Sequence, residues 1–273
     1  MDAVKRQILI SGDLQSQEFA GLAAWLSDWP NVELIRAERI SDISTASVAN
    51  VDIILLCAAR PGRFSVDEVE AFRQRNPLAQ LIQIFGPWCI GEARTGPVPD
   101  GLQRMAWYEW SYRLPSVIED GSPVPSTSSP QEQVFASLGE LTGDGPSASV
   151  GIWAGTAADF DYLRSACHAL GHTATWLRAE QHLTPGELDA AVGIVPGTDG
   201  PEFAELSRWF ATFPLIPKIA CLGGPTWEDW QKAQSCGVTA ILGQPFRLAD
   251  LATLLQPHAD CGILPLVNQP SSR

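Results

Sequence analysis

The chain has 273 residues, of which 45% are hydrophobic and 18% charged, a composition typical of a globular protein rather than a disordered one. Its formal net charge is -13, and an acidic chain repels phosphate backbones and anionic lipid, so we expect neither nucleic-acid nor membrane binding. No apolar run approaches the roughly 20 residues that span a bilayer. The N-terminal sequence becomes polar too early for a signal peptide.

Length and cysteine usage narrow the class further. With about 150 residues in a typical domain, the length of the chain predicts two domains. The six cysteines show no paired C-x-x-C spacing. This pattern fits free thiols better than a zinc site or a disulfide framework, so we expect a cytoplasmic protein.

The first half alternates strand and helix patterns. Strands are predicted at residues 7–13, 32–40, 51–58, 79–85 and 102–110, and helices at 16–29, around 43–49 and after Ser65, which begins an S-x-x-E capping box with Glu68. The expected fourth helix is absent. A Gly- and Pro-rich loop at 86–101 replaces it, and a loop of that length in a compact domain is often functional.

The second half repeats the alternation without a gap. Strands are predicted at 149–155, 173–179, 190–197, 215–224 and 238–243, and helices at 157–172, from Thr184, at 200–213, from Thr226 to Gly237 and at 247–256. The strands are nearly continuous apolar runs. Such strands, each followed by a helix, predict a parallel sheet that is covered on both faces.

A Pro- and Ser-rich stretch separates the halves. We therefore predict a first domain at 1–113, a linker at 114–147, a second domain at 148–258 and a tail at 259–273. Within the linker, Ser129 and Pro130 begin a helix at 130–141, which is a candidate for the displaced last helix of the first domain.

Two stretches carry a resemblance to a known family. "GVTAILGQPFRLADL" at 237–251 and "VDIILLCAARPG" at 51–62 resemble the fifth strand with its proline turn, and the third strand, of receiver domains in bacterial two-component response regulators. The resemblance implies two flavodoxin-like (βα)5 domains in tandem, each with a five-stranded parallel sheet of order 2-1-3-4-5. It also implies a cis-proline turn at Pro245.

The residues that receiver chemistry needs are missing at both sites. The family uses an acidic pair for Mg²⁺, a phosphoacceptor aspartate, a Ser or Thr and a lysine. The corresponding positions here are Asp13 and Cys57 in the first half, and Ala154, Gly155, Ile194 or Val195, Gln244 and Pro245 in the second. The lysine position of the first half falls among residues 107–110. We therefore predict pseudo-receiver domains that bind no metal or cofactor and catalyse no reaction.

The predicted function is phosphorylation-independent signalling or scaffolding through protein–protein interaction, with an unidentified partner or a second copy of the chain. The candidate binding residues are Trp88, Cys89, Glu92 and Arg94 on the loop, and Trp227 and Trp230 on a helix of the second half. Trp88 could instead plug the gap left by the missing helix, with Glu92 and Arg94 as a surface pair. The aromatic residues at 107–110 are either core residues or an exposed partner surface.

A redox or small-molecule sensor is the alternative function. Cys57 and Cys89 follow neighbouring strands, which run about 4.8 Å apart, and a disulfide needs Cα atoms within about 7 Å. The opposing interpretation is two inert, buried thiols. Residual phosphorylation of Asp13 is a third option. His168 and His172 have the spacing of zinc ligands on a helix but lack a third ligand, so we expect no metal.

Overall fold

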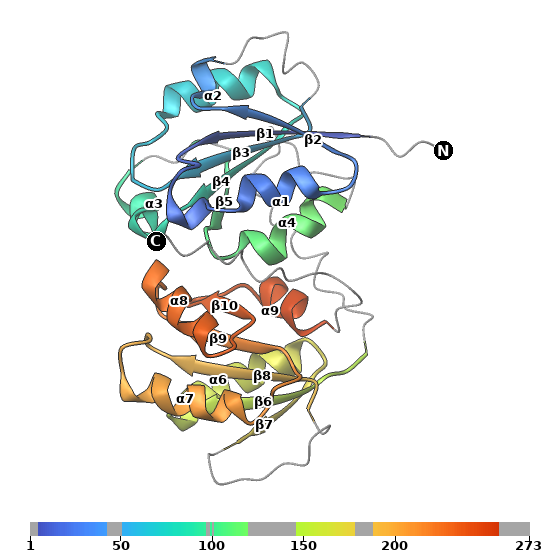
Figure 1. Cartoon of the computed structure of the whole chain (residues 1–273), viewed down its shortest axis with the longest axis vertical. Coiled ribbons are helices and arrows are strands. Elements are labelled where there is room, and N and C mark those ends of the chain that lie inside the picture. The colour runs from blue at the N-terminus through green and yellow to red at the C-terminus, as the bar shows by residue number, and fades with distance from the viewer. Residues whose placement is uncertain are drawn as a thin grey trace, which may run out of the picture. The chain divides into compact units, whose positions relative to one another are not determined.

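The computed structural model describes residues 5–42, 51–96, 99, 101–119, 146–177 and 188–256. The chain divides into two compact units, the first holding strands β1 to β5 and the second β6 to β10 (Figure 1). The helices predicted around 43–49, at 130–141 and from Thr184, and the tail at 259–273, lie outside the described residues.

The first unit is built on a five-stranded sheet of order β2-β1-β3-β4-β5, in which every neighbouring pair is parallel. Its strands are β1 (Arg6–Gly12), β2 (Val32–Ala37), β3 (Ile53–Ala58), β4 (Gln80–Phe85) and β5 (Gln103–Ala106). All six residues of the central strand β3 are buried, which accounts for its uninterrupted apolar sequence.

Helices cover both faces of this sheet. They are η1 (Gln17–Phe19), α1 (Leu22–Asp28), η2 (Ile40–Asp42), α2 (Val66–Arg75), η4 (Pro87–Cys89), α3 (Glu92–Thr95) and α4 (Trp110–Glu119). Helices α1 and α4 lie on one face and α2 on the other (Figure 1). The predicted cap of α2 is confirmed, because Ser65 Oγ accepts the backbone N–H of Glu68 at 3.2 Å.

The second unit has the same order, β7-β6-β8-β9-β10, again with parallel pairs. Its strands are β6 (Ser149–Ala154), β7 (Thr173–Trp176), β8 (Ala190–Val195), β9 (Lys218–Leu222) and β10 (Ala240–Gly243), and its helices are α6 (Ala157–Ala169), α7 (Pro201–Ala211), α8 (Trp227–Ser235) and α9 (Leu248–Leu255). The predicted fold class, two α/β units with flavodoxin-like 2-1-3-4-5 sheets, is confirmed.

The end of the first unit differs from the prediction. Strand β5 stops at Ala106, because the Glu109 carboxylate accepts the backbone N–H of Ala106 at 2.9 Å and pairs with Arg113 at 2.6 Å. Helix α4 then continues through Pro115 to Glu119, so the residues at 114–119 are helical and not linker. The helix persists despite its proline because its apolar face, including Leu114, is buried.

The aromatic run at 107–110 therefore lies after β5 rather than on it. Trp107 is only 2% exposed and Trp110 only 3%. Trp110 contacts Trp25 of α1 edge-on, with ring centroids 5.3 Å apart. These two tryptophans belong to the core, and the alternative of an exposed partner surface at this run is wrong for them.

Candidate functional site

The carboxyl ends of the strands form the edge of each sheet where open α/β folds place their ligands. The strand registers show which positions correspond in the two units. Gly12 pairs with Cys57 in the first unit, and Ala154 pairs with Ile194 in the second. Cys57 and Ile194 are thus equivalent strand positions, which selects Ile194 over Val195 as the counterpart of Cys57.

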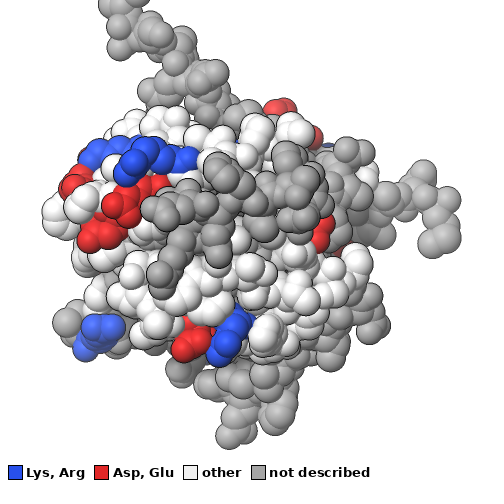
Figure 2. Space-filling view, turned by 90° about the horizontal axis from the view of Figure 1, so that it is seen from below, with Lys and Arg blue, Asp and Glu red and all other residues white. Residues whose placement is uncertain are grey.

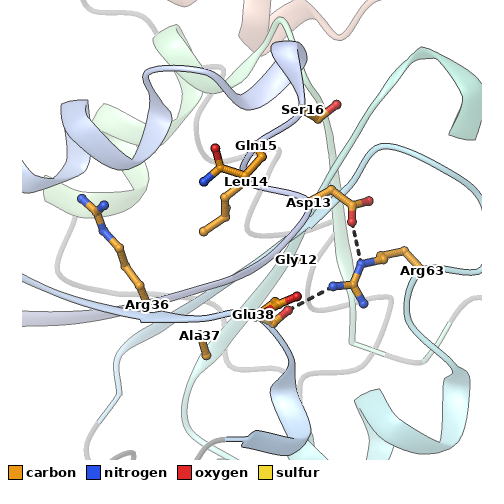
Figure 3. Close-up of a pocket in the computed structure, with 9 residues that line it drawn as sticks. All are labelled: Gly12, Asp13, Leu14, Gln15, Ser16, Arg36, Ala37, Glu38 and Arg63. Atoms are coloured by element: carbon orange, nitrogen blue, oxygen red, sulfur yellow. Dashed lines mark hydrogen bonds and ion pairs between the residues drawn. The ribbon is translucent and has the colours of Figure 1, made fainter.

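Asp13 is the one carboxylate that the resemblance places at the metal-binding position. Its Oδ1 accepts Arg63 Nε at 2.7 Å, and its Oδ2 accepts the backbone N–H of Ala59 at 2.9 Å. Arg63 is anchored in turn, since its Nη2 donates to the Glu38 carbonyl at 3.0 Å (Figure 3). A guanidinium from the same chain thus neutralises this carboxylate, and these residues do not fit a magnesium ion.

Cys57, at the position that the resemblance assigns to the phosphoacceptor, is fully buried. Its carbonyl accepts the backbone N–H of Asp13 at 2.9 Å, so the strand end is closed by main chain. Burial, with a smaller contribution from the Asp13 carboxylate, raises the pKa of the Cys57 thiol. The residue is a protonated thiol at neutral pH, in an environment that disfavours a nucleophile.

Cys89 lies nearby but is equally enclosed. Its Sγ donates to the Ala58 carbonyl at 3.5 Å. Burial and the Glu92 carboxylate raise the pKa of Cys89 to about 11, against a smaller lowering by Arg104. Both cysteines are free thiols. These environments favour the inert interpretation over the redox sensor.

Thiol alkylation provides a direct check of this interpretation. Treating the folded protein with iodoacetamide at neutral pH is expected to label Cys236, which is partly exposed, before Cys57 and Cys89. We expect Cys57 and Cys89 to react at least roughly 100-fold more slowly than Cys236. Their modification needs a local opening of the structure that costs about 3 kcal/mol or more. Peptide mass spectrometry measures the three rates. Labelling of either buried cysteine as fast as Cys236 would support the sensor alternative.

The loop that replaces the fourth helix folds into η4 and the single helical turn α3. Its Trp88 is 67% exposed, and Arg60 Cζ lies 4.6 Å from the centroid of the Trp88 ring. Ile90 and Arg94 are also exposed. We call the surface formed by Arg60, Trp88, Ile90 and Arg94 the Trp88 platform. The alternative in which Trp88 plugs the gap left by the missing helix is wrong.

Glu92 fixes the platform to the sheet edge. One of its carboxylate oxygens accepts the backbone N–H of Gly62 at 2.9 Å, and the other accepts Arg104 Nη2 at 3.3 Å. Arg104 also donates to the Cys89 carbonyl at 3.1 Å and stacks on Phe85 at 4.5 Å. Glu92 therefore joins the loops that follow β3 and β4. The suggested surface pair of Glu92 with Arg94 is wrong, because Glu92 pairs with Arg104.

In the second unit, the degenerate positions are filled by main chain and neutral groups. Ala154 and Ile194 are buried, and Gly155 follows them at the surface. Gln244 stands where the resemblance places a lysine, and its Nε2 donates to the Cys221 carbonyl of β9 at 3.3 Å. The peptide bond to Pro245 is cis, as the resemblance implied.

The lysine position of the first unit is also identified by register. The backbone N–H of Gln244 donates to Leu222 at 2.8 Å, and that of Trp107 donates to Phe85 at 2.9 Å in the equivalent place. The buried Trp107 thus stands where the resemblance places the lysine in the first unit. Neither unit places a cation at this position.

Two groups at this edge of the second unit were not predicted from the sequence. The Tyr162 ring packs on Phe246 with centroids 5.2 Å apart. Burial raises the pKa of the Tyr162 hydroxyl, Cys221 adds to the rise, and a hydrogen bond from the Phe246 backbone opposes it. The tyrosine of α6 therefore covers the ends of β9 and β10. The only sequence signal was an aromatic residue outside the apolar face of the helix predicted at 157–172.

The second group is Thr198, which donates to Asp229 in the capping box of α8. Asp229 accepts the backbone N–H groups of Thr198 and Thr226, both at 3.0 Å, and both hydroxyls. Burial on its own raises the pKa of Asp229, but these hydrogen bonds together lower it below its ordinary value. The predicted cap by Thr226 is confirmed, and the carboxylate has a structural role.

The predicted pair on α8 is arranged as a stack. The rings of Trp227 and Trp230 lie 4.9 Å apart at an interplanar angle of 17°, and both side chains are partly buried. They present less surface than Trp88 does. Among the described residues, no three His, Cys, Asp or Glu side chains gather as a metal site would require.

A pocket of about 590 Å³ lies beside Asp13 and was not predicted. It is lined by Gly12, Asp13, Leu14, Gln15, Ser16, Arg36, Ala37, Glu38 and Arg63 (Figure 3). The available signal was the pair of charged residues Arg36 and Glu38 within the strand predicted at 32–40. Nothing in the local pattern indicates that this pair lies near Asp13.

Comparison with known proteins gives no family. No family model and no curated protein matches the chain. Among solved structures, the E. coli RcsC C-terminus with its linker region and phosphoreceiver domain is similar at 10% identity and a TM-score of 0.32, covering 93% of this chain and 92% of that one. A D-isomer specific 2-hydroxyacid dehydrogenase family protein from Aeromonas salmonicida follows at 12% identity and a TM-score of 0.23, covering 91% and 92%.

A glyoxylate/hydroxypyruvate reductase from Sinorhizobium meliloti is similar at 14% identity and a TM-score of 0.23, covering 89% of this chain and 83% of that one. These likenesses are too distant to assign a function. In the described part of the chain, no helix is long and apolar enough to cross a bilayer.

Proposed function

We propose that the protein is a non-enzymatic signalling or scaffolding protein, in which two receiver-like units bind a protein partner without phosphorylation. The observation that carries this proposal is the Trp88 platform, where an exposed tryptophan stacks with Arg60 on a braced loop. Tryptophan and arginine are the residue types most often found as hot spots of protein interfaces.

The contacts of Glu92 favour binding because they order the Trp88 platform before a partner binds. Glu92 ties the loop after β3 to the loop after β4 and to Arg104, so a partner meets loops that already have one arrangement. Association then loses less conformational entropy at the interface. A partner with an apolar group for Trp88 would gain most from this surface.

Charge indicates the character of the partner. Among the described residues, neither Arg60 nor Arg94 forms an ion pair, whereas Glu92 and Asp13 are both engaged. The platform is therefore locally basic on a chain whose net charge is -13. An acidic partner surface would complement it and be steered toward it.

The absence of catalysis is part of the proposal. It is supported by Asp13, which is neutralised by Arg63, and by the buried Cys57, Ile194 and Trp107, which stand where the resemblance places phosphoacceptor and lysine residues. On the face shown in Figure 2, basic and acidic side chains lie close together rather than in a continuous basic surface. This distribution fits a protein partner better than a nucleic acid. The free thiols support a cytoplasmic location.

A capture experiment tests the platform. The full chain is immobilised, bound proteins are identified by mass spectrometry, and the affinity of each recovered partner is measured for wild type, Trp88→Ala and Leu78→Ala. Leu78 is 79% exposed in the same unit, between α2 and β4, so it controls for the loss of an exposed apolar side chain. We expect Trp88→Ala to weaken binding about 30-fold or more, as hot-spot truncations do.

The control variant is expected to bind like wild type. If the recovered partner is a second copy of the chain, sedimentation is expected to show a dimer that Trp88→Ala dissociates. Equal affinity of Trp88→Ala and wild type for every recovered partner would rule out the platform as the binding surface.

A further inference from the structure

The pocket beside Asp13 is separate from the Trp88 platform. It is formed by residues 12–16 after β1, residues 36–38 at the end of β2, and Arg63 from the loop after β3. We call it the β1–β2 pocket. Its volume of about 590 Å³ is in the range of small-molecule sites, and it lies outside the carboxyl ends of parallel strands, where such sites occur.

Part of the lining is already engaged and forms fixed walls. Asp13 uses one oxygen for Arg63 and the other for the Ala59 backbone. Arg63 is held between Asp13 and the Glu38 carbonyl. Arg36 Nη2 donates to the Ala23 carbonyl at 3.0 Å and to Ser27 Oγ at 2.8 Å, which fixes its guanidinium against α1. These contacts hold two cations in position around the pocket.

Other polar groups of the lining remain available to a ligand. No described residue donates to the Glu38 carboxylate or bonds to the Gln15 amide, and both side chains are exposed. The Nη1 and Nε atoms of Arg36 are likewise not engaged by described residues. Figure 3 shows the Gln15 and Arg36 head groups toward one end of the pocket and Glu38 beside Arg63 at the other, with Leu14 between them.

This arrangement restricts the chemistry of a ligand. A metal ion would find only one free carboxylate, because both oxygens of Asp13 already accept hydrogen bonds from within the chain. A cation would meet two guanidinium groups, and a compact anion without hydroxyl groups would leave Glu38 without a donor. A ligand with hydroxyl groups at one end and a negative group at the other satisfies both ends.

We propose that the β1–β2 pocket binds a phosphorylated ribose, either as a free sugar phosphate or as part of a nucleotide. The two vicinal hydroxyls donate to the Glu38 carboxylate, and the phosphate accepts from Arg36 and the Gln15 amide. Leu14 and Ala37 contact the apolar face of the sugar. The pocket thereby gives the first unit a small-molecule input that needs no covalent step.

Titration of the full chain with defined probes tests this assignment. Ribose 5-phosphate is added at up to 10 mM, and binding is followed by calorimetry and by amide NMR shifts of residues 12–16. We expect saturable binding. Removing one hydroxyl, in 2-deoxyribose 5-phosphate, is expected to weaken it about 10-fold, and inorganic phosphate alone is expected to bind more weakly still. AMP binding tighter than ribose 5-phosphate assigns a nucleotide, and equal or weaker AMP binding assigns a free sugar phosphate.

Two variants, one within β2 and one directly after it, distinguish the loss of a pocket side chain from the loss of negative charge in general. Glu38→Gln removes the acceptor inside the pocket and is expected to weaken ribose 5-phosphate binding about 10-fold. Glu33→Gln removes the same charge from β2 at a residue that pairs with Lys5 outside the pocket, and it is expected to bind like wild type. Absence of binding by wild type at 10 mM would overturn the proposal. Equal loss in both variants, or phosphate binding as tightly as ribose 5-phosphate, would do so too.

Discussion

Gly12→Ala is expected to destabilise the first unit by about 3 kcal/mol, because it combines backbone strain with a clash. Gly12 ends β1 with φ at +114°, and a Cβ atom built there would lie 2.1 Å from the Cys57 carbonyl oxygen. The opposing atom is main chain of a buried central strand, so it has little freedom to move. The close approach of β1 to β3 therefore requires glycine at this position.

Gly62→Ala is the matched control for this effect. Gly62 also has a positive φ, at +72°, but a Cβ atom there would meet nothing within 4 Å. Its substitution is expected to cost only about 1 kcal/mol. Hydrogen exchange of the β3 amides, measured at increasing urea concentration, compares the free energy of unfolding of the first unit in the two variants. Equal losses of stability would show that the contact with Cys57 contributes nothing.

Leu206→Ala is expected to destabilise the second unit by about 2–5 kcal/mol, as truncation of a fully buried leucine does. Leu206 of α7 packs directly over Gly193 of β8. A Cβ atom built at Gly193 would lie 2.1 Å from Leu206 Cδ1 and 2.8 Å from its Cδ2. Gly193→Ala alone is therefore expected to cost about 1–3 kcal/mol by overpacking.

The two changes should compensate in part. In the double variant, the added methyl group occupies space that the leucine side chain has left, so the combined loss is expected to be smaller than the sum by about 1 kcal/mol or more. Denaturant unfolding of the wild type, both single variants and the double variant measures this coupling. Strict additivity would contradict the packing of α7 on β8.

Features that depend on neighbouring residues were predicted well from the sequence. The uninterrupted apolar run of β3 and the capping residues Ser65 and Thr226 reflect local requirements for burial and for hydrogen bonds at a helix start. The missing fourth helix of the first unit was visible in the Gly and Pro residues of its replacement. The sheet order followed from the resemblance and not from periodicity.

Features that depend on residues distant in the sequence were missed. The pairing of Asp13 with Arg63 joins positions 50 apart, and the bond from Arg36 to Ala23 joins positions 13 apart. The boundary of β5 was misplaced because Glu109 and Arg113 begin α4 inside an aromatic run that resembles a strand. Pro115 suggested a linker, whereas burial of its neighbours outweighs its cost in the helix.

The positions that the resemblance assigns to receiver chemistry are occupied differently in the two units. In the first, Arg63 neutralises the Asp13 carboxylate and Trp107 stands where the resemblance places a lysine. In the second, Gln244 binds the end of β9 and Tyr162 packs over the same edge. Each replacement makes stabilising contacts of its own. Both edges are therefore built as fixed surfaces, which suits recognition of a partner.

The most direct test of this account is exposure of the full chain to acetyl phosphate and Mg²⁺, followed by intact-mass measurement. Because Asp13 is bound to Arg63 and no carboxylate occupies the position of Cys57 or Ile194, we expect the mass to remain that of the unmodified chain. Partner affinity is expected to be the same before and after the treatment. A phosphoryl adduct that disappears in Asp13→Asn, together with a change in partner affinity, would contradict the account.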